Sequence, residues 1–291
     1  MSRDPVFQAP TLRAEDFEKF RKLAYEKFGL NLTEAKHDLV SARLSKKLRE
    51  MKLPTYQAYY EYVVADRSGE SLVALIDALS TNHTAFWREA SHFEFLRREV
   101  IPKLRGKPRI DVWSAPCSTG EEAYTLAITM MEELGAAAAG VRVYGTDIST
   151  RALAKAQAGT YCPDRLSGVP PGLIRKYFTA SGPNFQVLPE VRRLVEFERV
   201  NLIEPVRGNR IFQVIFCRNM LIYFDKPTQE RVVNELARHL EPGGYLFVGH
   251  SESLMGIRQP LEYVKPAIYR SAAHRPEGGA AHSASRERGV R

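Results

Sequence analysis

The sequence predicts a doubly wound α/β domain that follows a small N-terminal all-α domain and carries a small antiparallel β insertion. Three observations support this fold class. Apolar residues recur at helical spacing over residues 14–80, strand and helix patterns then alternate to residue 270, and one stretch of short apolar segments broken by Gly and Pro interrupts them. At 291 residues the chain is long enough for one large and one small domain.

Residues 1–80 are predicted to form the small helical domain. Their apolar positions, for example Phe17 and Phe20, follow a helical period, and Gly29 lies in a turn signal between two such segments. We expect four short helices here. A linker over residues 81–90 would then lead into the larger domain.

Residues 91–270 are predicted to form the α/β domain. The expected strands are 109–114, 141–145, 212–217 and 245–249, and the expected helices are 91–104, 121–134, 150–158 and 228–240. Because strands and helices alternate, the sheet should be parallel. Ligands of such sheets bind beyond the carboxyl ends of the strands, so polar residues that directly follow a strand are the first candidates for a site.

Two further segments differ from this alternation. Residues 179–199 contain short apolar stretches broken by Gly182 and by two prolines, which is typical of a small antiparallel insertion. Residues 271–291 are rich in Ala, Gly, Ser and Arg and have almost no large apolar side chains. We expect them to be a disordered tail.

Composition restricts the class of protein. The three cysteines lie far apart and lack paired metal-ligand spacing, so the sequence indicates neither a disulfide framework nor a metal site, and a reducing cytoplasmic location fits. The chain lacks a run of about 18 apolar residues, so we expect no direct membrane insertion. The formal charge of +8 is spread along the chain and does not by itself indicate a nucleic-acid partner.

The loop after the first expected strand is the first candidate site. It contains one glycine, Gly120, and lacks the Gly-x-Gly-x-x-Gly pattern that lets a backbone approach a pyrophosphate. Glu121 and Glu122 at the start of the next helix would repel a phosphate but suit a cationic ligand such as S-adenosylmethionine, which carries an ammonium and a sulfonium. The alternative is that both acids only favour the helix N-terminus.

Polar residues also follow two other expected strands. Asp147 comes after the second strand, where a carboxylate can accept hydrogen bonds from a ribose diol; alone, it could equally be a turn or N-cap residue. Arg218 and Asn219 follow a buried strand and predict a polar partner there. Their alternatives are a solvated arginine and a loop-capping asparagine, and Tyr223 could be a core residue.

Several motifs together resemble the chemotaxis receptor methyltransferase (CheR) family over about residues 14–270. They are Thr81–Glu89 (TNHTAFWRE), Ser114–Glu122 (SAPCSTGEE), Asn201-Leu202, Phe216–Phe224 (FCRNMLIYF) and Gly249–Glu252 (GHSE). The resemblance implies a class I methyltransferase-like sheet. It also implies transfer of a methyl group from S-adenosylmethionine to glutamate side chains of chemotaxis receptors, with S-adenosylhomocysteine as the product.

The resemblance also implies roles for individual residues. Cofactor-binding positions would be Asn82, Thr84 and Arg88 from the linker, Glu122 at the amino-acid or adenosyl portion, Asp147 at the ribose, Asn201 and Leu202 at the adenine, and Arg218 and Asn219 at the methionyl side. The catalytic residues bordering the incoming carboxylate would be Arg88, Arg218 and Tyr223. A glutamate side chain is already ionised at neutral pH, so we expect no catalytic base.

A basic helical segment near residues 35–50 is the candidate docking surface. By the resemblance, Lys36, Arg43 and Arg49 would contact the acidic methylation region in the cytoplasmic domain of methyl-accepting chemotaxis receptors, and the protein would be recruited to receptor arrays. The alternative is an ordinary solvated helix face.

Two other function classes remain open at this point. One is a nucleic-acid methyltransferase, although Arg218-Asn219-Met220 stands where an Asn/Asp-Pro-Pro-aromatic motif is expected. The other is a noncatalytic module that binds the cofactor and docks to receptors.

Overall fold

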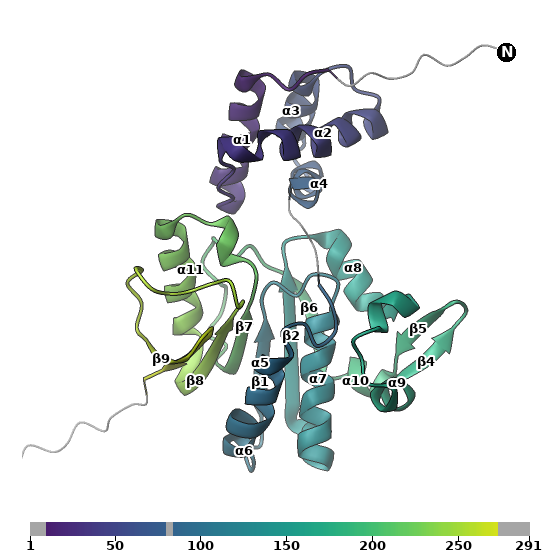
Figure 1. The fold of residues 1–291 in the computed structure, drawn as a ribbon, viewed down its shortest axis with the longest axis vertical. Coiled ribbons are helices and arrows are strands. Elements are labelled where there is room, and N and C mark those ends of the chain that lie inside the picture. Colours follow the sequence, from purple (N-terminus) through teal and green to yellow (C-terminus); the bar gives the residue numbers. More distant parts are fainter. Residues whose placement is uncertain (1–9, 80–83, 273–291) are drawn as a thin grey trace, which may run out of the picture.

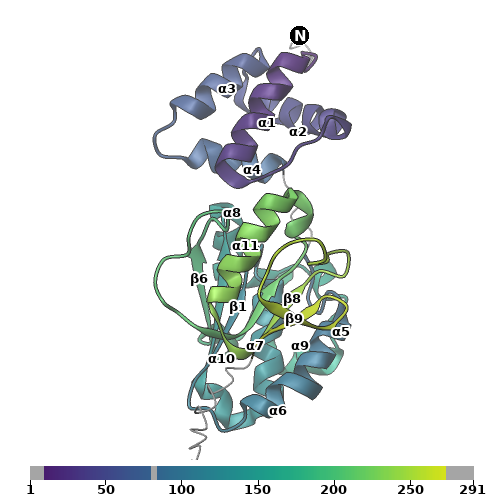
Figure 2. The same ribbon diagram turned by 90° about the vertical axis from the view of Figure 1, so that its left-hand side faces the viewer.

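The chain folds into a helical domain that sits above a larger α/β domain (Figures 1 and 2). The computed structural model describes residues 10–79 and 84–272. Within these ranges, no helix combines the length and the apolar character that a bilayer crossing requires.

Four α-helices form the N-terminal domain, as the sequence predicted. They are α1 (Ala14–Phe28), α2 (His37–Met51), α3 (Tyr56–Ala65) and α4 (Glu70–Leu79), with a 3-10 turn at Glu34–Lys36 before α2. Phe20, Leu44 and Leu48 are fully buried in the core of this domain. Because its core is separate from those of the larger domain, the helical domain packs as a unit of its own.

The end of α1 makes direct contact with the larger domain. Gly29 has a φ of 70° and terminates the helix in the left-handed region. A Cβ atom at this position would lie 2.8 Å from Ile203 Cγ2 and 3.0 Å from Thr228 Cγ2. A glycine is therefore needed here both for the backbone turn and for the close approach of the two domains.

The α/β domain is built on a seven-stranded sheet in the order β6-β2-β1-β7-β8-β10-β9. The strands are β6 (Val195–Arg199), β2 (Val141–Asp147), β1 (Ile110–Ser114), β7 (Phe212–Cys217), β8 (Leu240–Val248), β10 (Ile268–Ser271) and β9 (Leu261–Lys265). The pairs from β6 to β8 are parallel, and β10 and β9 are antiparallel. The order reverses between β1 and β7, so the ligand-binding crevice is expected at their carboxyl ends.

Helices cover both faces of this sheet (Figure 1). The helices are α5 (Ala90–Phe95) with the π-helical turn Leu96–Val100 and α6 (Ile101–Leu104), α7 (Glu121–Leu134) with the 3-10 segment Gly135–Gly140, α8 (Thr150–Ala158), and α11 (Lys226–Arg238). α5 to α8 contribute to one apolar core and α11 to a second one across the sheet. This arrangement confirms the doubly wound α/β fold.

The small antiparallel sheet differs from its predicted range. It consists of β3 (Thr160–Tyr161), β5 (Asn184–Val187) and β4 (Phe178–Ser181), with the 3-10 turn Pro163–Leu166 and α9 (Pro171–Tyr177) between the strands and α10 (Pro189–Arg192) after them. The predicted range of the insertion, 179–199, was wrong at its C-terminal end. Its last five residues form β6, which pairs in parallel with β2 at the edge of the main sheet. A short edge strand with one solvated face alternates like an antiparallel strand, so sequence alone could not separate the two.

The C-terminal boundary also shifts slightly. Ser271, which was placed in the predicted tail, is the last residue of β10 and pairs with Leu261. The tail after residue 272 lies outside the described residues.

Candidate active site

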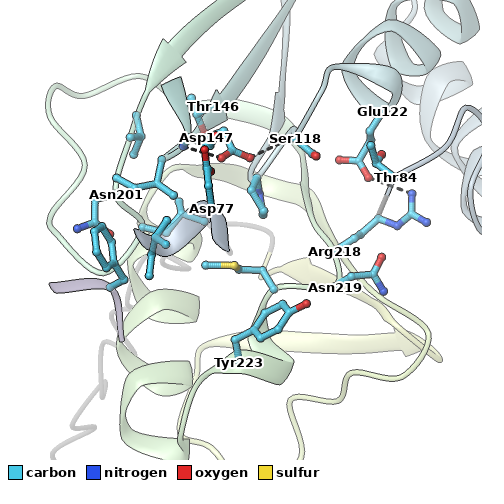
Figure 3. A pocket seen from close by; sticks show the side chains of 18 of the residues that line it. Asp77, Thr84, Ser118, Glu122, Thr146, Asp147, Asn201, Arg218, Asn219 and Tyr223 are labelled. Carbon is cyan, nitrogen blue, oxygen red and sulfur yellow. Dashed lines mark hydrogen bonds and ion pairs between the residues drawn. The ribbon is translucent and has the colours of Figure 1, made fainter. Parts of the chain in front are cut away.

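One cavity lies at the carboxyl ends of β1, β2 and β7, and the helical domain closes its other side (Figure 3). Of the predicted site residues, Thr84, Arg88, Glu122, Asp147, Asn201, Leu202, Arg218, Asn219 and Tyr223 all line it. Asn82 lies outside the described residues. The structure thus brings together side chains from four separate motifs, while the role of each remains a prediction.

The loop after β1 forms the floor of the cavity beside Asp147. Gly120 has a φ of 94°, and a Cβ atom there would lie 2.8 Å from the Cβ of Ala156, so only glycine fits without displacing α8. The preceding loop directs the backbone N–H of Ser118 toward Asp147 Oδ2 at 2.8 Å. This contact ties the carboxyl ends of β1 and β2 to each other.

Asp147 is a buried carboxylate with two backbone donors. Its Oδ1 accepts the N–H of Ser149 at 2.9 Å, and its Oδ2 accepts that of Ser118. Burial raises the pKa of Asp147 above its ordinary value, although both backbone donors act in the opposite direction. Each oxygen still has a lone pair that could accept a hydrogen bond from a ligand hydroxyl.

A second carboxylate, Asp77 from α4, faces the same part of the cavity (Figure 3). Its Oδ2 lies 3.5 Å from Arg151 Nε, and its buried Oδ1 has no hydrogen-bond partner among the described residues. The negative charge of Asp77 adds to the raised pKa of Asp147. The helical domain thereby contributes an acceptor that sequence reasoning missed.

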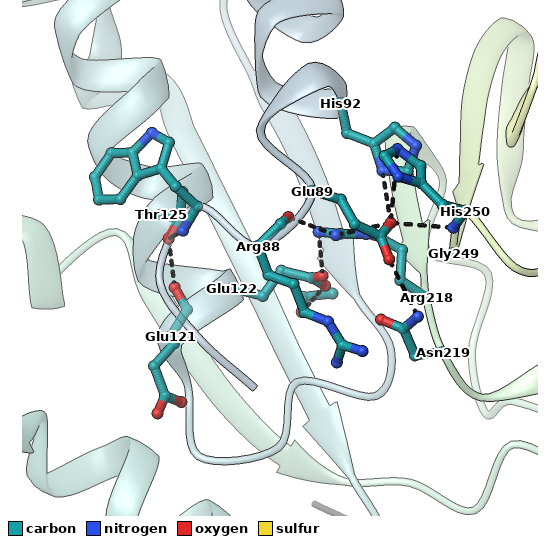
Figure 4. Close-up of polar contacts among 12 residues, drawn as sticks. Arg88, Glu89, His92, Glu121, Glu122, Thr125, Arg218, Asn219, Gly249 and His250 are labelled. Carbon is teal, nitrogen blue, oxygen red and sulfur yellow. Dashed lines mark hydrogen bonds and ion pairs between the residues drawn. The ribbon is translucent and has the colours of Figure 1, made fainter. Parts of the chain in front are cut away.

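Arg218 is held between two carboxylates at the end of β7 (Figure 4). Its Nη1 donates to Glu122 Oε2 at 3.0 Å, and its Nη2 lies 3.0 Å from Glu89 Oε2 and also donates to the Arg88 carbonyl. Only 2% of the Arg218 side chain is exposed. A charge this deeply buried requires such partners, since an unpaired guanidinium would cost several kcal/mol (about 3 to 5).

The two carboxylates respond differently to the same guanidinium. Burial raises the pKa of Glu122 despite the opposing effects of Arg218 and of the hydroxyl of Ser114. Burial also acts to raise the pKa of Glu89, but there the charge of Arg218 and the amide of Asn219 prevail and the pKa is lowered. Glu122 is therefore the carboxyl group of this pair that a cationic ligand would shift most readily toward its ionised form.

Glu121 takes no part in this network. The sequence predicted that both Glu121 and Glu122 face a cationic ligand, and only Glu122 lines the cavity. Glu121 points away from Arg218 in Figure 4 and lies 3.5 Å from Arg165 Nη1. Successive helical residues point about 100° apart, so two adjacent acids at a helix start cannot both face one ligand.

Glu252 fixes the loop that carries Asn219 and Tyr223. Its Oε2 accepts the backbone N–H groups of Gly249 at 2.6 Å and Asn219 at 2.8 Å, and its Oε1 accepts that of Ile222 at 3.2 Å. These bonds hold the 3-10 turn Leu221–Tyr223 against β8. Glu252 and Glu89 both lie in motifs that carried the family resemblance, yet neither was assigned a role, because a sequence does not show which backbone groups a carboxylate will reach.

The helical domain supplies an apolar wall that the sequence did not predict. Phe28, Leu30 and Ile76 line the cavity opposite the sheet. The backbone N–H of Asn31 donates to the Tyr223 carbonyl at 2.8 Å, which joins this wall to the loop that carries Tyr223. The only sequence feature near this wall that had been singled out was the turn at Gly29, and it predicted the end of a helix but not a contact with the cavity.

Asn201 lies at the far end of the cavity from Arg218 (Figure 3). Its Nδ2 donates to the Lys27 carbonyl at 3.0 Å and to Glu204 Oε1 at 2.8 Å, and the neighbouring Leu202 is buried. Asn201 thus joins the end of α1 to the loop after β6. The apolar Leu202 and the aromatic Phe28 give this end the character of a pocket for a planar ring.

The fold and the acidic cavity at the switch point of the sheet define the protein as an S-adenosylmethionine-dependent methyltransferase of the class I type. Family comparison then places it more narrowly. The chain belongs to the CheR methyltransferase family: the family model for the SAM binding domain matches residues 82–269, and that for the all-alpha domain matches residues 15–80.

Relatives named as chemotaxis protein methyltransferases match over most of their length. The chain is 40% identical to the chemotaxis protein methyltransferase of Salmonella typhimurium, over 87% of this chain and 88% of that protein. It is 38% identical to chemotaxis protein methyltransferase 2 of Pseudomonas aeruginosa, over 89% and 93%, and 36% identical to the chemotaxis protein methyltransferase of Borreliella burgdorferi, over 88% and 94%.

Acidification is expected to weaken binding of S-adenosylhomocysteine. The pKa values of Glu122 and Asp147 in the ligand-free protein lie above their ordinary values, and a ligand that carries an ammonium and donates hydroxyls favours the ionised forms. Affinity should therefore be full above the raised pKa values and fall as the pH drops through them. Calorimetric titrations from about pH 7.5 down to about pH 5 measure this dependence.

Glu122→Gln provides the control for that titration, because it removes one of the two titrating groups and should flatten the pH profile. An affinity of the wild-type protein that stays constant, or rises, toward acid pH would contradict the expected coupling.

Proposed function

We propose that this chain methylates glutamate side chains in the cytoplasmic domain of chemotaxis-type receptors, producing glutamate methyl esters and S-adenosylhomocysteine. The observation that carries the proposal is the cavity itself, in which acidic groups from three elements surround a space bordered by Arg88 and Tyr223. The names of the relatives supply the pathway. On this proposal the protein acts in the cytoplasm and is recruited to receptor arrays.

The polar groups follow one another along the cavity as the parts of the cofactor would. Asp147 and Asp77 would accept the ribose hydroxyls, and Glu122 would face the cationic amino-acid portion. Asn201 and Leu202 would border the adenine at the opposite end. The cofactor supplies an electrophilic methyl carbon on a positively charged sulfur, and the residues of this chain orient it.

The substrate carboxylate needs positioning more than activation. A glutamate side chain has a reference pKa of about 4.3, so it is already a nucleophile at neutral pH. One carboxylate oxygen would take the methyl group, and the electron pair of the broken carbon–sulfur bond would pass to sulfur. Holding the two reactants in line contributes several kcal/mol (about 7 to 11 in well-oriented model reactions) to lowering the barrier.

Arg88 and Tyr223 are the proposed contacts to that carboxylate. Arg218 was predicted to share this role, but both of its terminal nitrogens already bind protein acceptors. We therefore propose that Arg218 is a positioning residue that holds Glu122 and the Arg88 backbone. The carboxylate loses its charge in the transition state, so Arg88 should orient it without binding it tightly.

The proposed docking surface begins at the 3-10 turn before α2, beside Tyr223 of the cavity. Lys36 Nζ lies 5.8 Å from the centre of the Tyr223 ring, which places a positive charge next to the expected substrate position. Arg43 donates to the Leu79 carbonyl at the end of α4. Arg49 is six residues further along the helix and therefore points about 120° away from Arg43. The three predicted docking residues do not share one face.

Methyl transfer tests the proposal directly. Wild-type protein incubated with methyl-labelled S-adenosylmethionine and a receptor cytoplasmic fragment should label the fragment in an alkali-labile form, since methyl esters hydrolyse in base. Arg88→Ala should lower turnover by about a hundredfold or more, because it loosens the near-attack geometry, while the unfolding midpoint changes little. Labelling of nucleic acid instead of the fragment, or wild-type turnover by Arg88→Ala, would contradict the proposal.

A pair of charge reversals, Lys36→Glu in the 3-10 turn before α2 and Arg49→Glu in α2, tests the docking surface. Lys36→Glu should lower kcat/KM for the receptor fragment about tenfold while leaving affinity for S-adenosylhomocysteine unchanged, because the lost contact is to an acidic partner. Arg49→Glu is the matched control and should have a much smaller effect. Equal effects of the two substitutions, or none from Lys36→Glu, would exclude this docking surface.

A further inference from the structure

A cluster of two histidines and a glutamate lies next to Arg218 (Figure 4). The ligand-capable atoms of Glu89, His92 and His250 all lie within 4.8 Å of one another. Glu89 Oε2 is 3.5 Å from His92 Nδ1 and 4.0 Å from His250 Nε2. The ring centres of the two histidines are 4.5 Å apart.

His92 is the most unusual member of this cluster. It is 1% exposed, and neither of its ring nitrogens has a hydrogen-bond partner among the described residues. Leaving a buried polar group unsatisfied costs about 1 to 3 kcal/mol. The neighbouring Phe216 and Phe247 rings offer no acceptor, so the Nδ1 side that faces Glu89 is where a partner would bind.

From this geometry we propose that Glu89, His92 and His250 form a binding site for a zinc-class transition-metal ion that regulates the cofactor cavity. Two imidazoles and one carboxylate are the donor set of open zinc sites and do not favour magnesium or calcium, which prefer oxygen ligands. Ligand atoms around tetrahedral zinc lie about 3.4 Å apart for bonds of about 2.0 to 2.1 Å. The observed spacing therefore needs only modest side-chain movement.

Access and charge also suit a metal ion at this position. The His250 side chain is 51% exposed, which gives the ion an entry path and leaves room for a water ligand. Two carboxyl groups, Glu89 and Glu122, share the single guanidinium of Arg218. The absence of paired cysteines in the sequence does not bear on this site, because none of its ligands is a cysteine. Its two histidines lie far apart in the sequence and are brought together by the fold.

Metal binding at Glu89 would act on the cofactor cavity through Arg218. Glu89 Oε2 is the oxygen that holds Arg218 Nη2, at 3.0 Å, and also accepts the N–H of His250 at 3.2 Å. A metal ion on this oxygen competes with the guanidinium. Arg218 and Asn219, which line the cavity, would lose part of their anchoring, so the site is inhibitory and the metal and the cofactor weaken each other's binding.

Zinc titration of the full chain tests the site. Metal-free protein should bind one equivalent of Zn²⁺ in competition with a chromophoric chelator, and Co²⁺ should give visible absorption bands of a low-coordinate histidine site. His250→Ala, which keeps the backbone N–H to Glu89, should weaken zinc binding by about tenfold or more. No stoichiometric binding, or equal affinity in His250→Ala, would overturn the proposal.

Two control variants test three of the other histidines. His37→Ala alters an exposed histidine of α2, and His274→Gln with His282→Gln removes both tail histidines; zinc affinity should persist in each, and its loss in either would assign the metal elsewhere. Saturating zinc should also weaken S-adenosylhomocysteine binding several-fold in the wild type but not in His250→Ala. Unchanged wild-type affinity would contradict the inhibitory coupling. Zinc affinity is measured without methyl transfer, so its failure leaves the proposed function untouched.

Discussion

The structure depends above all on one buried guanidinium. Arg218 leaves the carboxyl end of β7 and binds Glu122 from α7, Glu89 before α5 and the backbone of Arg88. Together with Arg218 itself, these groups come from three segments that are far apart in the sequence. Burying them together is costly unless every charge is paired, so the arrangement is held in one geometry. That geometry fixes the end of the cavity that Glu122, Arg218 and Asn219 line.

The helical domain lines the candidate site as well as being a candidate docking module. Gly29 lets α1 end against Ile203, and the Asn31 N–H binds the loop of Tyr223, so the two domains share a wall. Asp77 adds a carboxylate beside Asp147 from the same side. A substrate that contacts Lys36, in the 3-10 turn before α2, would therefore lie close to Tyr223 and the cavity.

Most of the fold could be predicted from the sequence, and part of the site could not. Periodicity located α7, α8 and β7 at their observed bounds, and polar residues after buried strands identified Asp147 and Arg218. Such signals are local. The edge strand β6 and the contribution of Asp77 depend on pairing and packing between distant segments, which single-sequence patterns do not contain.

The most direct test of the central claim is the affinity of Arg218→Lys for S-adenosylhomocysteine, measured by calorimetry beside the wild type. Lysine keeps the charge but has all its donors on one nitrogen, whereas Arg218 reaches its acceptors through Nη1 and Nη2 separately. We expect one equivalent to bind the wild type, and the folded variant to bind about tenfold or more weakly, a loss of about 1.4 kcal/mol. Equal affinity in the two proteins, or no binding by the wild type, would contradict the claim that this guanidinium builds the cofactor cavity.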